Sequence, residues 1–277
     1  MNKSSNTNAH GARLLTLLRG LLAEPSGCPD DPWRRPILMR RGGVCGAVLD
    51  LRDVDPKAPD DALRKALRAA RQAMAAEPEA VLLPGGLTYQ ILRESKPGSG
   101  PLVGKVWLVT GAAGAIGAGI CRSLLAQGAC VGAADVNRRA LKDLEGELCA
   151  SALDRVVGFP MNVCSPASVA AAFDDAAVAW GGVDGLVVNA GTALVAPLAE
   201  LKLDEFRRLE RVNVEGALLT LSEAGRRFRL QGTGGDIVLI STKNVFAPGA
   251  QFGAYSATKA AAHQLARIAS LEMAPFD

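Results

Sequence analysis

The 277-residue sequence contains very little histidine and tyrosine: His10 and His263 are the only histidines, and there are two tyrosines. Two histidines are too few for a histidine-based metal site or for a Ser-His-Asp triad. The six cysteines never come two residues apart, so the spacing of a zinc or redox motif is also absent. We therefore predict no metal site, and reduced thiols in a cytoplasmic protein.

Long apolar runs and blocks of like charge are also lacking. The run at residues 14–23 is interrupted by Arg19 and is too short to span a bilayer. It lacks a small-residue cleavage site, so it does not resemble a signal peptide, although a basic, acid-free start leaves organellar targeting open. The net charge is +3, and where basic residues adjoin, as at Arg34-Arg35 and Arg40-Arg41, they form pairs and no longer block. We therefore expect neither a membrane nor a nucleic acid as a partner.

The first hundred residues contain no motif with recognisable chemistry. Leucines at positions 14, 17, 18, 21 and 22 predict a helix with one apolar face, and residues 25–36 suggest a Pro-rich linker. Two strands joined by a turn are predicted at residues 37–51, a helix at 60–76 and a strand at 80–83. We expect a small strand–helix–strand unit here, and a boundary in the Gly-, Pro- and Ser-rich stretch 95–101. This divides the chain into an N-terminal extension, residues 1–100, and a domain at residues 101–277.

From residue 105 onward, short apolar strands alternate with helices. Strands are predicted at residues 106–109, 130–134, 155–159, 186–188 and 237–240, with the first helix at 116–127. Strands separated by helices of ten or more residues imply a parallel sheet that is covered on both faces. The predicted fold class is therefore α/β, a doubly wound parallel sheet of the Rossmann type.

A glycine-rich loop, residues 110–117, lies between the first of these strands and its helix. Glycines in such a turn let the backbone approach a pyrophosphate, and the helix N-terminus offers free N–H groups. Asp135 follows at the end of the second strand, where a carboxylate can bind an adenosine ribose and would repel a 2′-phosphate. We therefore predict NAD as the cofactor, while Arg138 and Arg139 keep NADP open as the less favoured one. A plain turn with a solvated aspartate is the alternative.

Tyr255 and Lys259 are four residues apart at the start of an Ala-rich segment that is predicted to be helical to about residue 274. On a helix they share a face, and a cation beside a phenol favours the phenolate. Such a tyrosine can exchange a proton with an alcohol or carbonyl oxygen. Taken alone, such a pair is far more often a half-buried aromatic ring beside a solvated lysine.

Residues 103–275 resemble the short-chain dehydrogenase/reductase family. The resemblance rests on the loop at 110–117, on Asn-Ala-Gly at 189–191, on Asn213 in Asn-Val-x-Gly, and on Tyr255 with Lys259. The family implies hydride transfer between NAD(P) and a small secondary alcohol or ketone, within a homodimer or homotetramer. It assigns Tyr255 as the general acid/base, Lys259 as the residue that stabilises its phenolate and holds the nicotinamide ribose, and Asn213 as part of a proton-relaying water chain.

Two positions depart from the family pattern. The family's serine usually stands thirteen residues before the tyrosine, which is Thr242 here, with Ser241 one step earlier. Either hydroxyl remains a candidate, and the spacing favours Thr242. Asn162-Val163 replaces the Asp-Val that contacts the adenine in the family. The resemblance assigns the cofactor contacts to Thr110, Gly111, Ala113, Gly114, Ala115, Ile116, Gly117, Asp135, Val136, Asn162, Val163, Asn189, Ala190, Gly191, Tyr255 and Lys259.

A third departure is that the family normally continues beyond the helix of Tyr255 with another strand and a substrate-covering segment. We therefore expect the sheet to be incomplete at its C-terminal end with an uncovered edge, completed by a longer gene product or a partner chain. A non-catalytic dinucleotide-binding or scaffolding protein, or an inactive fragment, is the alternative to an enzyme. Residues 241–249 are also similar to dehydrogenase domains fused behind class II aldolases, which act on sugar-derived substrates.

Overall fold

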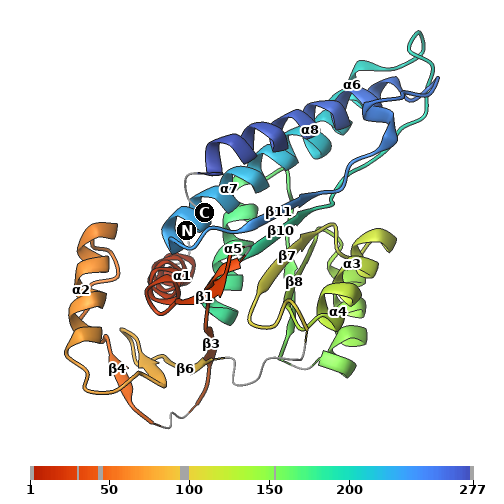
Figure 1. Ribbon diagram of the computed structural model, residues 1–277. Coiled ribbons are helices and arrows are strands. Elements are labelled where there is room, and N and C mark those ends of the chain that lie inside the picture. The colour runs from red at the N-terminus through yellow and green to blue at the C-terminus, as the bar shows by residue number, and fades with distance from the viewer. Residues whose placement is uncertain (1–2, 30, 43–45, 94–99, 153, 275–277) are drawn as a thin grey trace.

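The structure, a computed structural model, describes residues 3–29, 31–42, 46–93, 100–152 and 154–274. Most of the predicted boundary at 95–101 lies outside the described residues. Two sheets dominate the described part: a parallel one formed after residue 105 and a smaller one formed before residue 93 (Figure 1).

The larger sheet has five parallel strands in the order β11-β10-β7-β8-β9. These strands are β7 Val106–Thr110, β8 Cys130–Asp135, β9 Val156–Pro160, β10 Gly185–Val188 and β11 Asp236–Leu239. The predicted doubly wound α/β fold is confirmed. Because the strand order reverses between β7 and β10, the carboxyl ends of these two strands flank the crevice where such folds bind ligands. β11 lies at an edge, and its Val238 is 45% exposed.

Helices cover both faces of this sheet (Figure 1). One face packs against α3 Ala115–Ala126 and α4 Arg138–Ala152, and the other against α5 Pro166–Trp180, α7 Gly216–Gln231 and α8 Gly253–Met273. Side chains of β7 alternate between the two cores: Val106 and Leu108 point to the side of α5, and Trp107 and Val109 to the side of α3. Burial of both faces explains why the strands read as unbroken apolar runs.

The N-terminal elements form a sheet of their own in the order β3-β6-β5-β4. They are α1 Lys3–Leu21, β1 Glu24–Cys28, β2 Asp31–Arg34, β3 Ile37–Arg40, β4 Val48–Asp50, α2 Asp60–Gln72, β5 Ala80–Leu82 and β6 Thr88–Leu92. β4 and β5 are parallel neighbours with α2 between them in sequence, which is the expected strand–helix–strand arrangement. β3 pairs with β6, a strand that we had not predicted.

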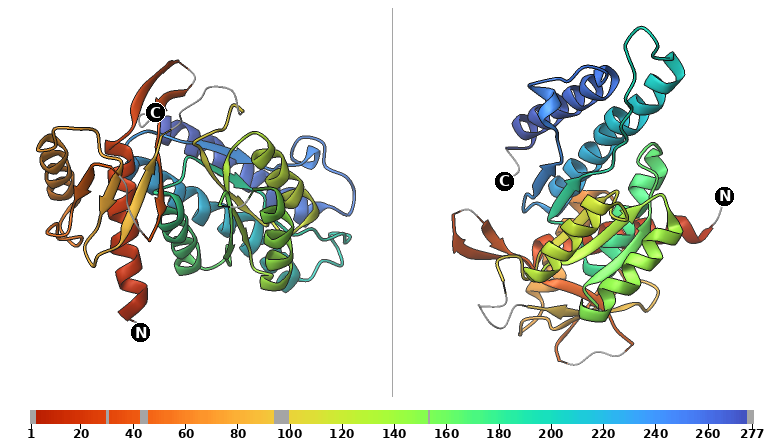
Figure 2. Two further views of the ribbon diagram at one scale, coloured as in Figure 1. Left: turned by 90° about the horizontal axis from the view of Figure 1, so that it is seen from below. Right: turned by 90° about the vertical axis from the view of Figure 1, so that its right-hand side faces the viewer.

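The predicted Pro-rich linker at residues 25–36 is wrong. β1 and β2 pair there as an antiparallel ribbon, with Pro25 opposite Trp33 and a bulge between Pro25 and Cys28. Each strand of a two-stranded ribbon has only one neighbour, so a proline can place its missing N–H on the open side. The ribbon projects from the rest of the molecule in both views of Figure 2.

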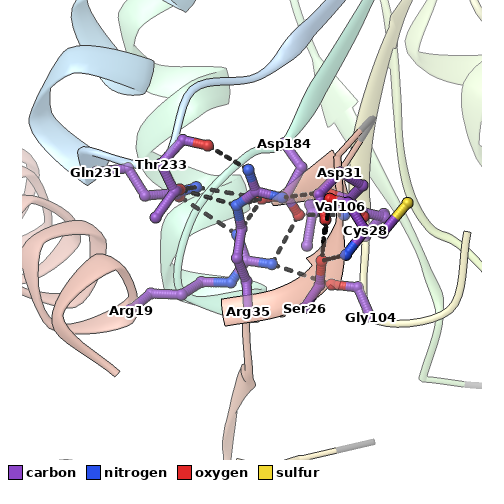
Figure 3. A network of polar contacts seen from close by, with 11 residues as sticks. Arg19, Ser26, Cys28, Asp31, Arg35, Gly104, Val106, Asp184, Gln231 and Thr233 are labelled. Carbon is purple, nitrogen blue, oxygen red and sulfur yellow. Dashed lines mark hydrogen bonds and ion pairs between the residues drawn. The ribbon is translucent and has the colours of Figure 1, made fainter. Parts of the chain in front are cut away.

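The N-terminal helix α1 packs against α5 and α7, with Leu14, Leu17 and Leu18 buried, as its apolar face predicted. Arg19 is completely buried, and its two Nη atoms donate to the two carboxylate oxygens of Asp184 at 2.8 and 2.7 Å (Figure 3). Asp184 directly precedes β10, at the amino end of the sheet. The N-terminal elements are thus attached at the amino ends of the strands, opposite the carboxyl ends of β7 and β10.

The carboxylate of Asp184 is held by several groups at once. It accepts the backbone N–H of Val106 at 2.8 Å and an N–H of Gln231 at 3.1 Å, and Arg35 lies 3.4 Å away. Burial favours a raised pKa for Asp184, but the charge and hydrogen bonds of Arg19, Arg35 and the Val106 N–H outweigh it, so its pKa lies below the ordinary value. The carboxylate therefore stays charged in the interior.

Candidate active site

The glycine loop turns directly from β7 into α3. Gly111 has φ +63°, and a Cβ at this position would lie 2.9 Å from the Cα of Ala190. A Cβ on Gly117 would lie 2.2 Å from the carbonyl oxygen of Gly111. Both positions therefore require glycine, one for its backbone conformation and the other for the close approach of loop and helix.

The N-terminus of α3 is open to a ligand. Gly114 is its N-cap, no side chain caps the first turn, and Ile116 is 63% exposed. Gly114 and Ala115 are exposed as well. Unpaired N–H groups and the positive end of the helix dipole suit a phosphate group here, so these residues fit the pyrophosphate of a dinucleotide.

The Asn-Ala-Gly motif follows directly after β10 and is bonded to the glycine loop. The Thr110 hydroxyl accepts the backbone N–H groups of Asn189 and Ala190, both at 3.0 Å, and donates to Val187. The Asn189 side chain donates to the carbonyl oxygens of Thr110 and Gly111 at 2.9 and 3.0 Å. The two strand ends on either side of the crevice are therefore fixed relative to each other.

Asp135 ends β8 beside the same loop. Its carboxylate accepts the backbone N–H of Ala113 at 3.0 Å and that of Asn137 at 2.9 Å. These bonds fix the carboxylate at the carboxyl end of the sheet, while the next residue, Val136, is 69% exposed. A carboxylate fixed at this position can accept hydrogen bonds from a ribose diol and would repel a phosphate group added to the ribose.

Lys259 is the buried cation of the site. Its side chain is 7% exposed, and Nζ donates to the Ile240 carbonyl oxygen at 3.0 Å, where β11 has just ended. A Cβ on Gly191 would lie 3.3 Å from this Nζ, so the glycine leaves room for the ammonium group. Burial lowers the pKa of Lys259. The predicted helix of Tyr255 and Lys259 is present as α8, which begins at Gly253.

Tyr255 lies one helical turn before Lys259 and is half-buried. Its ring makes an edge contact with Phe252, with ring centroids 6.4 Å apart. Within the described part of the chain, the phenol oxygen makes no hydrogen bond, so it is free to bind a substrate oxygen. Residues four apart on α8 share a face, which places the phenol and the ammonium group on the same side of the helix.

Asn213 is buried in a π-helical turn, η1 Arg211–Glu215, between α6 Leu203–Glu210 and α7. Its amide accepts the backbone N–H of Thr192 at 2.8 Å and donates to the Thr192 carbonyl and the Thr258 hydroxyl. The sequence did not indicate these two threonines as anchors, although Thr258 stands inside the Tyr-x-x-x-Lys motif. A π-turn of this kind is frequent at functional sites.

Of the two candidate hydroxyls, Thr242 is the more enclosed. It is half-buried and caps the 3₁₀ turn η2 Lys243–Val245, where its Oγ1 accepts the Asn244 N–H at 3.3 Å. That bond uses an oxygen lone pair and leaves the hydroxyl hydrogen for another acceptor. Ser241 is exposed.

Asn162 and Val163 follow β9 at the same edge of the sheet. The Asn162 side chain accepts the backbone N–H of Cys164 at 3.0 Å, which leaves its amide nitrogen for a ligand. Val163 packs beneath Gly216, where a Cβ would lie 2.8 Å from it. The residues assigned to the cofactor thus lie at the carboxyl ends of β7, β8, β9 and β10, and Thr242, Tyr255 and Lys259 lie beyond β11 and on α8.

Other kinds of site are not favoured. The described residues contain no group of three or more His, Cys, Asp or Glu side chains arranged for a metal ion. None of the helices in the described ranges is long and apolar enough to cross a membrane.

In a comparison with known protein families, residues 105–277 match the family model described as short chain dehydrogenase. The chain is 36% identical over 173 residues to the "Uncharacterized oxidoreductase YuxG" of Bacillus subtilis, covering 62% of this chain and 25% of that protein. It is 38% identical over 160 residues to the D-threitol dehydrogenase of Mycolicibacterium smegmatis, covering 57% of this chain and 60% of that protein. The chain therefore spans about a quarter and three fifths of these two relatives.

Solved structures show the same similarity. A short chain dehydrogenase from Mycobacterium smegmatis superposes with a TM-score of 0.63 at 31% identity, over 66% of this chain and 77% of that chain. An NAD+-bound xylitol dehydrogenase superposes with a TM-score of 0.61 at 30% identity, over 64% and 68% of the two chains. The family model covers more than half of the sequence. This chain belongs to the short chain dehydrogenase family.

Proposed function

We propose that the chain is an NAD-dependent oxidoreductase that interconverts a secondary alcohol and a ketone. The observation that carries this proposal is the position of Lys259: a buried ammonium group beside Gly191, one turn after Tyr255 and next to the crevice between β7 and β10. Relatives named D-threitol dehydrogenase, sorbitol dehydrogenase and L-2,3-butanediol dehydrogenase support this reaction class.

In the oxidation direction, the Tyr255 phenolate accepts the proton of the substrate hydroxyl, and in reduction the phenol donates it back. The Thr242 hydroxyl donates a hydrogen bond to the same substrate oxygen and keeps it in place. Lys259 favours the phenolate through its charge. Asn213 holds the loop at Thr192 and, by resemblance, helps to order the water that takes the proton onward. The nicotinamide, when bound, accepts or supplies the hydride.

We propose that NAD is favoured over NADP because of Asp135. A phosphate on the adenosine ribose would meet its fixed carboxylate, whereas a free ribose diol can donate hydrogen bonds to it. Arg138 and Arg139 open α4 close by in sequence, and they could offset the repulsion only in part. Calorimetric titration with NADH and NADPH tests this preference. Tighter binding of NADPH by the unmodified chain contradicts it.

Tyr255→Phe tests the reaction itself. We expect turnover of secondary alcohols to fall by about 100-fold or more, the range for loss of a general acid/base, with NADH still bound. Tyr89→Phe is a matched control, because Tyr89 is the other tyrosine and is buried in the N-terminal core. Unchanged turnover in Tyr255→Phe contradicts the assigned role. Tight NADH binding by the unmodified chain, without turnover of any alcohol or ketone, favours a non-catalytic dinucleotide-binding protein.

We also propose that α7 and α8 contact a second copy of the chain in a homodimer or homotetramer. Leu218 on α7 is 47% exposed, and Ile268 and Leu271 on α8 are 41% and 78% exposed. Leu218 and Ile268 line a groove between the two helices, together with Leu221, Leu265 and Met273. Light scattering should report a dimer or larger, and Ile268→Glu should shift it to a monomer. A monomer at micromolar concentrations for the unmodified chain rejects this contact.

A further inference from the structure

Thr258 is a buried polar residue on α8 whose hydroxyl group connects two parts of the proposed site. It is 2% exposed and stands between Tyr255 and Lys259 in the sequence. Its Oγ1 donates to the backbone carbonyl oxygen of Tyr255 at 3.0 Å and accepts an N–H of the Asn213 side chain, also at 3.0 Å. One hydroxyl group therefore joins the first turn of α8 to the π-helical turn η1.

The direction of these hydrogen bonds is fixed by the groups that take part. A carbonyl oxygen can only accept, so the hydroxyl hydrogen of Thr258 goes to Tyr255 and its lone pairs are left for Asn213. The second hydrogen of the Asn213 amide nitrogen goes to the Thr192 carbonyl oxygen at 2.9 Å, and Oδ1 accepts the Thr192 N–H at 2.8 Å. Without the Thr258 hydroxyl, one amide hydrogen would be buried and unpaired, which costs free energy.

The position of the Asn213 amide matters because of the group beside it. A Cβ on Gly191 would lie 3.2 Å from Asn213 Oδ1 and 3.3 Å from Lys259 Nζ, so both atoms border the same glycine. An amide oxygen carries a partial negative charge, which favours the charged form of a nearby ammonium group. In a buried site this interaction is stronger than it would be in water. A turned or displaced amide would therefore change the electrostatic surroundings of Lys259.

We propose that Thr258 is a positioning residue for proton transfer and that it acts through Asn213. Its hydroxyl keeps the amide in the orientation that places Oδ1 beside Gly191 and Lys259. This inference rests on the proposed function, because it concerns the same proton transfer. At 2% exposure, Thr258 is too buried to contact substrate or cofactor. Loss of its hydroxyl should therefore slow the reaction without weakening the binding of either.

The test removes the hydroxyl and keeps the shape of the side chain. The substrate is whichever of 2-butanol, 2,3-butanediol and sorbitol the unmodified chain oxidises fastest with NAD+. In Thr258→Val we expect kcat to fall by about 10- to 100-fold, the range for a small misplacement in a reaction site. KM and the affinity for NADH should change by less than about twofold. Thr258→Ser keeps the hydroxyl and should restore kcat to within about threefold of the unmodified chain.

Thr220→Val is the matched control. Thr220 is 0% exposed, and in the described part of the chain its hydroxyl bonds only to carbonyl oxygens of its own helix, α7. The substitution removes a buried helical hydroxyl in the same way, so kcat should stay within about twofold of the unmodified value. A double variant tests the route through Asn213: in Asn213→Ala, adding Thr258→Val should lower kcat by no more than about twofold.

The outcomes separate this inference from the proposed function. If Thr258→Val does not fold, Thr258→Ala replaces it in the comparison with Thr258→Ser. An unchanged kcat in a folded variant without the hydroxyl, or an equal fall in Thr220→Val, overturns the role of Thr258, while the loss of activity in Tyr255→Phe can still stand. Independent, multiplying losses from Thr258→Val and Asn213→Ala overturn the route through Asn213. Absence of turnover by the unmodified chain overturns the proposed function, and the role of Thr258 with it.

Discussion

Replacing Arg19 by methionine should strongly destabilise the protein. Arg19 and Asp184 are 0% and 1% exposed, and the substitution removes both bonds between the guanidinium group and the carboxylate. Breaking a buried pair by removing one partner costs about 3–5 kcal/mol, because it leaves the other charge buried. Arg35 at 3.4 Å and the Val106 N–H at 2.8 Å still face the carboxylate, so we expect a loss near the lower end, about 3 kcal/mol.

Urea unfolding followed by circular dichroism measures this loss. Arg122→Met is the matched control, because its partner Glu147 is 54% exposed and Arg122 itself 50%, so solvent screens this ion pair and its loss should change stability little. If Arg19→Met loses no more free energy of unfolding than Arg122→Met, the interpretation of Arg19 and Asp184 as a buried structural pair is wrong.

The same variant should change the response to acid. The folded-state pKa of Asp184 is below its ordinary value of 3.8, so its stabilising contribution is complete above that value and is lost as the pH falls through the folded-state pKa. Without Arg19, burial raises the pKa of Asp184 with less opposition. Arg19→Met should therefore begin to unfold at a higher pH than the unmodified protein in an acid titration, and coincident acid transitions contradict this.

Two further predictions concern the active site. Gly117→Ala places a Cβ 2.2 Å from the Gly111 carbonyl oxygen, so NADH binding should weaken by at least about tenfold in calorimetry, or ~1.4 kcal/mol. Gly119→Ala on the same helix, where a Cβ meets nothing within 4 Å, should bind NADH normally, and equal affinities of the two variants refute the close approach. Lys259→Met should abolish turnover yet raise the free energy of unfolding by about 0.5–1 kcal/mol at pH 7. The reason is that burial lowers the pKa of Lys259, so the charged ammonium group destabilises the folded protein at every pH below its folded-state pKa. This destabilisation is relieved as the pH rises from the folded-state pKa towards 10.5. A Lys259→Met variant that is less stable than the unmodified protein contradicts this reasoning.

The dehydrogenase part of the fold could be predicted because its signals are local. The strands after residue 105 are apolar on both faces, and the loop at 110–117 needs glycine at Gly111 and Gly117 for reasons that the loop itself imposes. The positions of Tyr255 and Lys259 on one helix also followed from their spacing alone. Their roles, and that of Asn213, remain predictions that kinetic experiments must test.

Features that depend on distant partners could not be predicted in this way. Arg19 interrupts an apolar run, and nothing near it in sequence indicates that its partner lies 165 residues away. The prolines of β1 and β2 are typical of a linker, so the pattern did not indicate a pair of strands. β6 is a five-residue strand with only Tyr89 and Ile91 buried, so its apolar pattern is short.

The N-terminal elements are attached at the amino ends of the strands, and this position determines where the molecule can be altered. The residues proposed for cofactor binding and proton transfer follow the carboxyl ends of the strands, while Arg19 joins α1 to the start of β10. Structure can therefore be added or exchanged around the projecting β1–β2 ribbon (Figure 2), whose Asp31 pairs with Lys105 just before β7, at the amino ends of the strands. The carboxyl ends of the strands carry the proposed chemistry, and the amino ends carry the N-terminal elements.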